Sequence, residues 1–389
     1  MPQPVIAAVG SSSVGRTDLP GRDLFSIALE EAFDGLPDPA ALADALYVGN
    51  QSEQYEHQIM HGTLLAEWAG LRNVPAERVE GCAAAGALAL RHAVKDVRNG
   101  DHEGVLACGV EKMTAGGTGG ATDALSAAFD RAIEQRSGVT APSQYALLAQ
   151  RYLHETDATE TDMAEIAVKN HSNALKNPRA QFSETIDAET VLDSPPVAPP
   201  LKLYDCAPVG DAAAVTLVTT AEVADDLGVP AVAVGGTGAA ANNIAVAERN
   251  MTEIEGAAIA AETAYEQAGI GPEAVDIAEV HDAFTVSEAL LSEAAGFAPT
   301  GRGYQSYLPP EERDGGWTDV ELNTSGGLKA RGHPIGATGI LQAIEAYEQL
   351  TGTAGDRAVS GAETALLINE GGVADAVTVA HVLTTEVAR

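Results

Sequence analysis

One supersecondary pattern occurs twice in the chain, about 230 residues apart. Residues 26–50 predict a helix, an acidic turn with proline, a short helix and a strand, and residues 258–284 repeat that order. Each copy follows an apolar run that ends at glycine, at residues 4–10 and 229–238, with the length and composition of a strand. Strand, helix and strand in this order indicate a βαβ unit, so we predict a duplicated α/β fold.

The two copies are separated by residues 113–200, whose composition differs from that of the rest of the chain. We predict there a glycine-rich loop at 113–121 and amphipathic helices at 142–155 and 163–177, followed by an extended proline-rich connection at 194–208. We interpret 113–200 as an excursion from the first half, although a plain helical insertion has almost the same pattern. The predicted division is an N-terminal half, residues 1–228, which includes this excursion, and a C-terminal half, residues 229–389.

A glycine-rich stretch, residues 323–339 (NTSGGLKARGHPIGATG), carries His333. It has five glycines and one proline, so it is not a core strand, and its backbone is expected to approach another group closely. Apolar residues at helical spacing follow it, so the loop leads into the N-terminus of a buried helix. The free N–H groups and the positive dipole of that helix end suit an oxyanion or a thioester carbonyl.

The net charge of −34 comes from 56 acidic and 22 basic residues, spread along the whole chain. This excess repels nucleic acid and anionic membranes, and it indicates a solvated acidic surface of the kind suited to a halophile. No apolar run approaches the ~18 residues that span a bilayer. The N-terminal sequence MPQPVIAAVG has no basic region or cleavage site, so we predict a cytoplasmic protein.

The chain has three cysteines, at positions 82, 108 and 206. An odd count without CxxC or Cys/His spacing supports neither a disulfide framework nor a metal site. Cys82 lies where a predicted helix begins, within residues 79–94, and the dipole of that helix is expected to lower the pKa of its thiol. Cys82 is therefore the strongest candidate nucleophile. Cys108 is predicted to be an inert core thiol, and Cys206 a structural residue in a turn.

The loop around His333 resembles the C-terminal histidine signature of the thiolase superfamily, NxSGGxxxxGHPxGATG. Further segments resemble archaeal and sterol-carrier-type thiolases in the family's order: GVEKMT at 109–114, AVKNHSNALKNP at 167–178, DCAP at 205–208 and HDAF at 281–284. The resemblance implies the thiolase fold, with two duplicated βαβαβαββ halves in a five-layer αβαβα arrangement. It also implies an inserted loop domain at about 113–200 that covers the active site.

The same resemblance implies an acetyl-CoA acetyltransferase or β-ketothiolase that uses CoA thioesters as substrates and holds no permanent cofactor or metal. Thiolase chemistry needs a thiolate, a base for it, oxyanion donors and a second base for an α-proton. By resemblance, Cys82 would carry the acyl group, His333 would be its base, and His281 would help to form the oxyanion hole. Four loop residues are predicted to bind substrate: Asn323, Ser325, Gly326 and Gly336.

The sequence departs from the family pattern at both cysteine positions. In the family motif, glycine and alanine stand three and six residues after the nucleophile, but Gly86 and Ala89 stand at those offsets from Ala83. Either the turn is rearranged so that Cys82 faces the site, or the nucleophile at position 83 has been lost. The second cysteine is also absent, and Glu370 is a conceivable carbon base, although a solvated loop carboxylate is the favoured interpretation.

These departures leave a second hypothesis, a catalytically degenerate thiolase-fold subunit that binds CoA or serves as a scaffold. A decarboxylating condensing enzyme is a third. By resemblance we also expect a homodimer or tetramer, with a small zinc-ribbon/OB-fold protein and hydroxymethylglutaryl-CoA synthase as partners. The sequence does not determine the acyl chain length, the reaction direction or the pathway.

Overall fold

A computed structural model describes residues 2–387 of the chain. Its main strands are β1 (Pro4–Ser11), β2 (Ala45–Gly49), β3 (Ala76–Val79), β4 (Gly104–Lys112), β7 (Asp211–Thr220), β8 (Val232–Ala241), β9 (Ile277–Glu279), β10 (Glu321–Leu322), β11 (Thr364–Gly371) and β12 (Val377–Thr384). They form one hydrogen-bonded order, β10-β9-β11-β12-β8-β1-β7-β4-β2-β3. The order is continuous only because β1 and β8 pair at Val5–Ala233 and Ile6–Val232.

On each side of this junction lie five strands with the same connectivity. β1 pairs antiparallel with β7, which pairs antiparallel with β4, and β2 and β3 then follow in parallel. In the other half, β8, β12, β11, β9 and β10 repeat these relations. The predicted duplication of an α/β unit is therefore confirmed.

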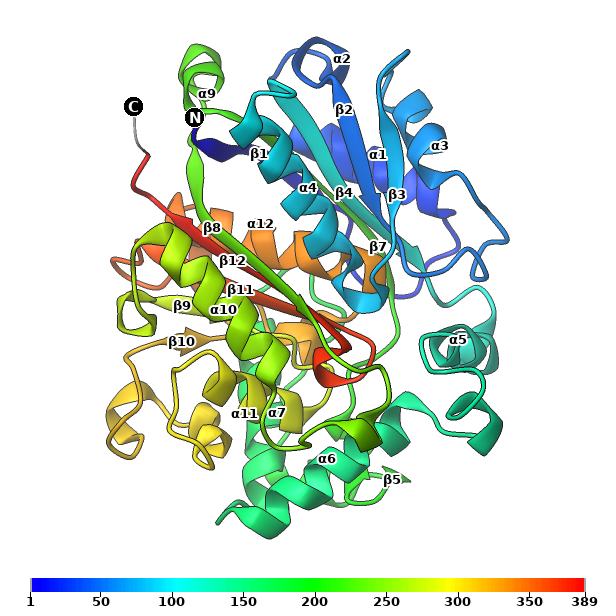
Figure 1. Ribbon diagram of the computed structural model, residues 1–389, viewed down its shortest axis with the longest axis vertical. Helices are drawn as coiled ribbons and strands as arrows, with labels where there is room; N and C mark the ends of the chain where they lie inside the picture. The colour runs from blue at the N-terminus through cyan, green and yellow to red at the C-terminus, as the bar shows by residue number, and fades with distance from the viewer. Residues whose placement is uncertain (1, 388–389) are drawn as a thin grey trace.

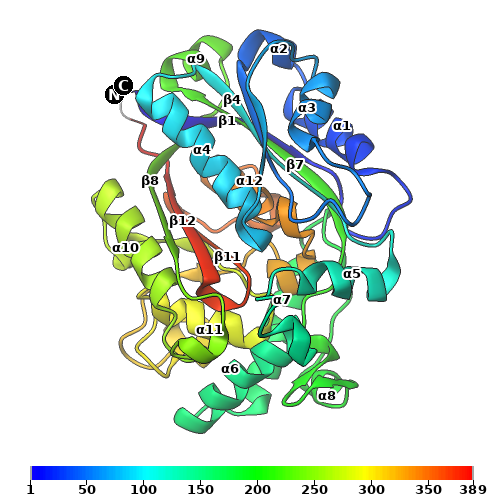
Figure 2. The same ribbon diagram turned by 45° about the vertical axis from the view of Figure 1, so that its right-hand side comes forward.

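The helices form three layers around the two sheet halves (Figures 1 and 2). α1 (Gly21–Ala32) packs on β1 and β7, and α10 (Glu255–Ala268) packs on β8 and β12. Between the halves lie α4 (Ala85–Asn99) and α12 (Thr338–Leu350), which contact each other and share one apolar core. The arrangement is the five-layer αβαβα fold that the sequence predicted.

Glycines allow α4 and the loop before α12 to approach closely. A Cβ atom on Gly86 would lie 2.7 Å from the carbonyl oxygen of Gly336, and one on Gly339 would lie 2.4 Å from the nitrogen of Ala87. No larger side chain fits at these contacts without a shift of the backbone. The contact explains Gly336 and Gly339 of the 323–339 loop, and it holds the beginning of α4 beside the segment that carries His333.

The excursion consists of α5 (Gly117–Ser126), α6 (Ala141–Glu155), α7 (Glu160–Ala174), α8 (Ala188–Leu192) and the short strands β5 (Pro196–Ala198) and β6 (Leu201–Lys202). Capping boxes at Thr140 and Thr159 begin α6 and α7. The prediction of a glycine-rich loop at 113–121 is wrong in part, because α5 begins at Gly117. Ala121 and Ala124 are buried against neighbouring apolar side chains, and this packing outweighs the low helix propensity of glycine.

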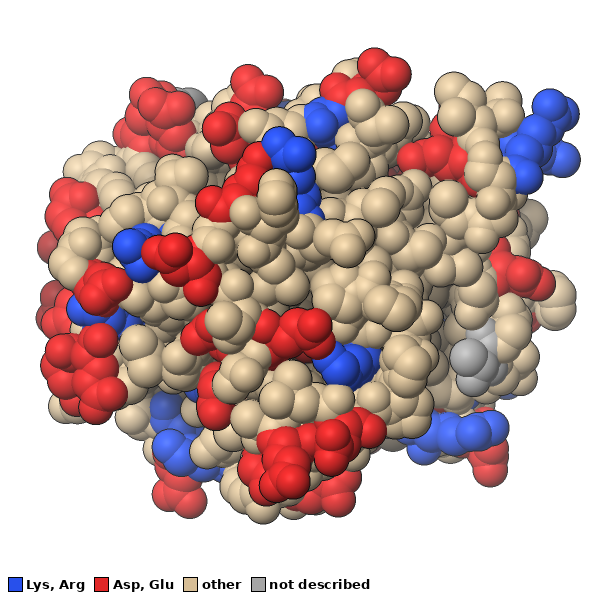
Figure 3. Space-filling model, turned by 90° about the horizontal axis from the view of Figure 1, so that it is seen from below, with Lys and Arg blue, Asp and Glu red and all other residues tan. Residues whose placement is uncertain are grey.

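The surface is strongly acidic. Figure 3 shows Asp and Glu side chains spread over one face of the molecule, with few Lys and Arg side chains among them. Within residues 2–387, no helix has the length and apolar character needed to cross a membrane.

Candidate active site

A cavity of about 200 Å³ lies where the two halves and the excursion meet. The wall residues are Cys82, Ala83, Met113, Thr122, Leu125, Thr140, Ala141, Pro142, Tyr145, Cys206, Ala207, Pro208, Val209, His281, Ala283, Phe284, His333, Ile335 and Gly372. The three residues predicted to be catalytic, Cys82, His281 and His333, therefore share one wall although they are far apart in the sequence.

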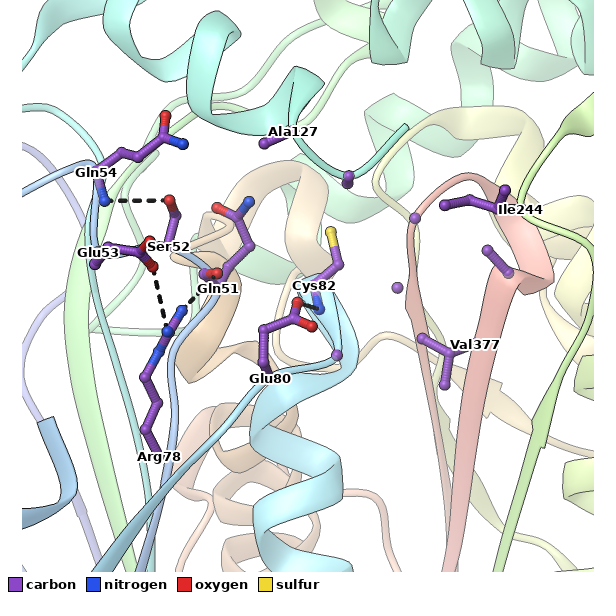
Figure 4. Close-up of a pocket in the computed structure, with 15 residues that line it drawn as sticks. Gln51, Ser52, Glu53, Gln54, Arg78, Glu80, Cys82, Ala127, Ile244 and Val377 are labelled. Carbon is purple, nitrogen blue, oxygen red and sulfur yellow. Dashed lines mark hydrogen bonds and ion pairs between the residues drawn. The ribbon is translucent and has the colours of Figure 1, made fainter. Parts of the chain in front are cut away.

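Cys82 occupies an unusual turn. Its φ of +50° lies in the left-handed region, and a short 3₁₀ turn, Cys82–Ala84, connects it to α4. The backbone N–H of Cys82 donates to Glu80 Oε1 at 2.7 Å. In Figure 4 the thiol points away from the first turn of α4. Cys82 and Ala83 both border the cavity. The thiol of Cys82 therefore reaches the cavity from the residue next to position 83, where the family motif has its nucleophile.

Cys82 also borders a more open hollow of about 440 Å³, which lies on the side drawn in Figure 4. Gln51, Glu53 and Arg78 line this hollow, and Arg78 Nη1 forms an ion pair with Glu53 Oε2 at 3.2 Å. The thiol therefore lies between the histidine cavity and a polar hollow.

The thiol of Cys82 is not acidified by its helix. Burial raises its pKa to about 11, although the N–H groups of Gly372 and Ala83 favour the thiolate. The prediction that the helix dipole would lower this pKa is wrong, because desolvation of the sulfur outweighs the nearby donors. At neutral pH the resting group is a thiol, and it needs a base.

Hydrogen bonds fix the tautomer of His333. Its Nδ1 lies 2.8 Å from Thr338 Oγ1, and that hydroxyl donates to the carbonyl oxygen of Pro334 at 3.2 Å. A hydroxyl that donates to Pro334 accepts from the ring, which favours the tautomer with the proton on Nδ1 and a free lone pair on Nε2. Burial, with Arg331 nearby, lowers the pKa of His333 to about 3, so the ring is neutral at neutral pH.

His281 has the opposite tautomer. Gln342 donates to the carbonyl oxygens of Glu279 and Ile368, so its Oε1 accepts from the Asn369 amide at 3.0 Å. The same Asn369 Nδ2 donates to His281 Nδ1 at 2.9 Å, so the ring proton of His281 is on Nε2. Burial first, and then His333 and Arg331, lower the pKa of His281 well below its usual value.

The two rings are perpendicular, at 85°, with centroids 5.0 Å apart. One imidazole offers a lone pair and the other a donor, which suits a base and an oxyanion partner. Sequence reasoning did not find Thr338, Gln342 or Asn369, which set these tautomers. Thr338 lies in the GATG end of the loop and Asn369 in the C-terminal segment. Their positions in these motifs were the only sequence signal that could have identified them.

The four predicted substrate-binding residues contact the protein and lie outside the cavity wall. The Asn323 side chain bonds to the Val280 backbone and to Glu288, and Ser325 donates to Glu279 at 2.5 Å. Gly326 packs on Ala174, and Gly336 donates its N–H to Glu111 at 3.0 Å. Direct contact of these four with substrate stays a prediction, and their observed contacts shape the His333 loop.

The remaining candidates also have defined places. Cys206 lines the cavity, and its Sγ donates to the carbonyl oxygen of Lys202 at 3.4 Å. Cys108 is fully buried in β4, as predicted. The interpretation of Glu370 as a solvated loop carboxylate is wrong, because this residue lies in β11 and is 2% exposed. Within residues 2–387, no group of three His, Cys, Asp or Glu side chains could hold a metal ion.

Comparisons with known proteins agree with this architecture. Residues 5–222 match the family model "Thiolase, N-terminal domain", and residues 236–385 match "Thiolase C-terminal domain-like". The chain belongs to the thiolase family. It is 40% identical to an acetyl-CoA acetyltransferase of Methanothermobacter thermautotrophicus, over 91% of this chain and 92% of that protein. It is 35% identical to the benzoylsuccinyl-CoA thiolase subunit BbsB of Thauera aromatica, over 89% and 88%.

Sterol carrier protein 2 of Rattus norvegicus is 32% identical over 84% of this chain, which spans 60% of that longer protein. Among solved structures, the Ltp2-ChsH2(DUF35) aldolase superposes with a TM-score of 0.82 at 21% identity. The match covers 98% of this chain and 97% of that one, and it supports the fold alone.

Proposed function

We propose that this chain is an acyltransferase of the thiolase type, which moves an acyl group between CoA thioesters through a thioester on Cys82. The observation that carries the proposal is the shared cavity wall of Cys82, His281 and His333, with the two imidazoles in opposite tautomers. His333 Nε2 is the base for the thiol. The Nε2–H of His281 donates to the carbonyl oxygen that becomes negative.

The pKa values constrain how the first step proceeds. The thiol has a pKa of about 11 and the imidazole of His333 a pKa of about 3. A separated thiolate–imidazolium pair is therefore strongly disfavoured. Proton transfer to His333 accordingly accompanies attack of the sulfur on the thioester carbonyl, while His281 stabilises the oxyanion. When the intermediate collapses, CoA leaves as the thiol with the proton from His333.

The size of the cavity favours a short acyl group. At about 200 Å³ it is smaller than the ~300 Å³ lower end of ordinary small-molecule pockets. The acetyl-CoA acetyltransferases of Methanothermobacter thermautotrophicus and Methanocaldococcus jannaschii, at 40% and 42% identity, support acetyl-CoA as the substrate. The CoA thioester is then a substrate, and the residues described here need no permanent cofactor for these steps.

The test is to trap and map the acyl-enzyme. The protein is incubated with radiolabelled acetyl-CoA in concentrated KCl, quenched in acid and digested, and the labelled peptide is identified by mass spectrometry. We expect label on Cys82 and its loss in Cys82→Ser. Cys206→Ser is the matched control, because Cys206 borders the same cavity, and it should keep the label.

The degenerate CoA-binding or scaffolding subunit is the alternative, and Ala83 at the family's nucleophile position favours it. Its signature is tight CoA binding with no label on any cysteine. Transfer of the label to residue 83 in Ala83→Cys, with none on Cys82, would show that the thiol at position 82 is misplaced.

We further infer a homodimer or tetramer that works with partner proteins in a salt-rich cytoplasm. β3 is an edge strand with one side unpaired, and Ile59 and Met60 are 62% and 63% exposed. A small zinc-ribbon/OB-fold protein is one candidate partner. Hydroxymethylglutaryl-CoA synthase is the other candidate. Light scattering in molar KCl measures the molar mass of the protein with and without these partners. A monomeric mass in both cases contradicts the inference.

A further inference from the structure

A buried tyrosine forms part of the cavity wall without a role in the steps above. Tyr145, on α6, is 3% exposed and stacks on Phe284, with ring centroids 4.3 Å apart and an interplanar angle of 25°. The backbone N–H of Ala374 donates to its hydroxyl at 2.9 Å. The phenol is thus held by a ring contact on one side and by a backbone donor at its oxygen.

A buried carboxyl group lies behind this phenol. Glu370 is 2% exposed, and its Oε2 atom has no hydrogen-bond partner among residues 2–387. Side chains alternate along a strand, so Asn369 of β11 reaches His281 while Glu370 points to the opposite face. An unpartnered carboxyl oxygen at this depth is costly unless the group is neutral or serves a function.

The surroundings of Glu370 keep it protonated. Burial first, and then the Asp375 carboxylate, raise its pKa well above the usual value, while Arg249 and a hydrogen bond with Tyr145 oppose the shift. The guanidinium of Arg249 is engaged elsewhere, since it pairs with Asp375 and donates to the carbonyl oxygen of Val373 at 2.8 Å. This environment favours the protonated form of Glu370, which lies next to the cavity wall.

The residues assigned so far include no second acid–base group, which is the role that this proton could serve. Cleavage or formation of a C–C bond beside a thioester requires a second acid–base residue, and position 283 on the wall is alanine. Cys206 also lies on the wall, but burial raises its pKa to about 12 and its S–H is directed at Lys202. The thiol of Cys82 is already used for acyl transfer.

We propose that Tyr145 is the second acid–base residue of this site and that Glu370 is a positioning residue that exchanges a proton with it. This inference rests on the proposed acyl transfer. The N–H of Ala374 donates to the phenol oxygen, and the O–H of a neutral Glu370 can donate to the same oxygen, which leaves the O–H of Tyr145 to donate into the cavity. Two donors to one oxygen also stabilise the phenolate that forms on transfer.

In the thiolytic direction, the sulfur of Cys82 adds to the keto carbon of a 3-ketoacyl-CoA and its proton passes to His333. The bond between the keto carbon and the α-carbon breaks, and its electron pair stays on the α-carbon as the acetyl-CoA enolate. That carbon takes the proton of Tyr145, whose oxygen takes the proton of Glu370. His333 then returns its proton to Glu370 through Tyr145. The neutral His333 takes the proton of the CoA thiol that cleaves the Cys82 thioester, and it passes that proton to the Cys82 sulfur as this leaves. Condensation follows the same steps in reverse.

Hydrogen–deuterium exchange at the methyl group of acetyl-CoA tests this pair, because exchange needs the acid–base group but no acyl-enzyme. The wild-type protein and variants are incubated with acetyl-CoA in D2O with concentrated KCl, and loss of the methyl proton signal is followed by NMR. In Tyr145→Phe we expect the rate of methyl exchange to fall by about 100-fold or more, because a general acid–base residue usually contributes a factor of that size. Label on Cys82 in the acetyl-CoA assay should persist in this variant.

The chain offers a matched control on the same helix. Tyr152 is also buried on α6, and its hydroxyl donates to Glu293 at 2.6 Å, but it lies outside the cavity wall. Tyr152→Phe removes the phenol hydroxyl from a second Tyr–Glu pair. This variant should exchange the methyl protons of acetyl-CoA at the wild-type rate.

Glu370 is tested through the pH profile. Exchange uses the ionised carboxylate, so the rate should rise with pH through the raised pKa of Glu370. Glu370→Gln should abolish this rise, and Glu370→Asp should restore part of it, whereas a merely structural role would not move the profile. Wild-type rates in Tyr145→Phe overturn the inference. So does a wild-type protein that acylates Cys82 without any exchange, which would leave the proposed acyl transfer intact.

Discussion

The protonated state of Cys82 determines how reactive the site is before a substrate binds. A half-buried thiol with a pKa of about 11 reacts slowly with any electrophile at neutral pH, because only the thiolate is nucleophilic. The two imidazoles cannot supply a standing positive charge, since burial lowers the pKa of both. The site is therefore neutral until a thioester arrives, which protects the thiol from oxidation and adventitious alkylation.

Alkylation of Cys82 by iodoacetamide should follow this pKa. The rate is expected to rise about tenfold per pH unit from pH 7 and to level off near pH 11, because the thiolate fraction grows in that proportion. Peptide mass spectrometry at each pH gives the rate for Cys82 separately from that of Cys206. A plateau below pH 8 would mean that the thiol is acidified, as the helix-dipole argument from the sequence predicted.

At the scale of elements, the crossing of α4 with the loop before α12 is the contact on which the site depends. Gly86→Ala would place a Cβ atom 2.7 Å from the carbonyl oxygen of Gly336. We expect a loss of about 1 to 3 kcal/mol in the free energy of unfolding, from overpacking. Chemical denaturation of folded protein measures it. Gly119→Ala is the control, because nothing lies within 4 Å of its added Cβ, and it should be neutral or slightly stabilising.

Much of this architecture could be predicted, because the sequence repeats one supersecondary pattern and its glycines cluster at the helix crossing. Burial was harder to predict. Glu370 precedes Gly371 and Gly372, which indicate an exposed turn, yet the carboxyl group is 2% exposed and lies beside Tyr145 of α6. The side of α6 that faces the cavity depends on packing between distant segments, so Tyr145 was placed in a helix but not in the site.

At the scale of the whole molecule, the charge of −34 makes stability depend on salt. Repulsion among exposed carboxylates extends about 10 Å at 0.1 M salt and about 3 Å at 1 M, so screening is largely complete by 1 M. We expect the melting temperature to rise steeply between 0.1 and about 1 M KCl and more slowly above that. Differential scanning calorimetry across a KCl series measures it.

A charge-reduced variant is the control for this prediction. Glu30, Glu262 and Glu266 are exposed, and changing all three to glutamine should flatten the salt dependence and raise the melting temperature at low salt. An unchanged slope would show that specific ion binding or hydrophobic salting-out, and not screening, governs stability.

The junction of β1 with β8 by two residue pairs has a consequence for how such a protein changes over time. One repeat contributes the sulfur and the other contributes both imidazoles, and each repeat keeps its own half of the sheet and its own outer helix. A substitution of the Cys82 side chain can silence the chemistry while the contacts of this turn with β11 and α12 of the opposite repeat stay in place. Catalysis can therefore be lost while the fold is retained. A chain of this kind can then acquire a non-catalytic function without a change of architecture.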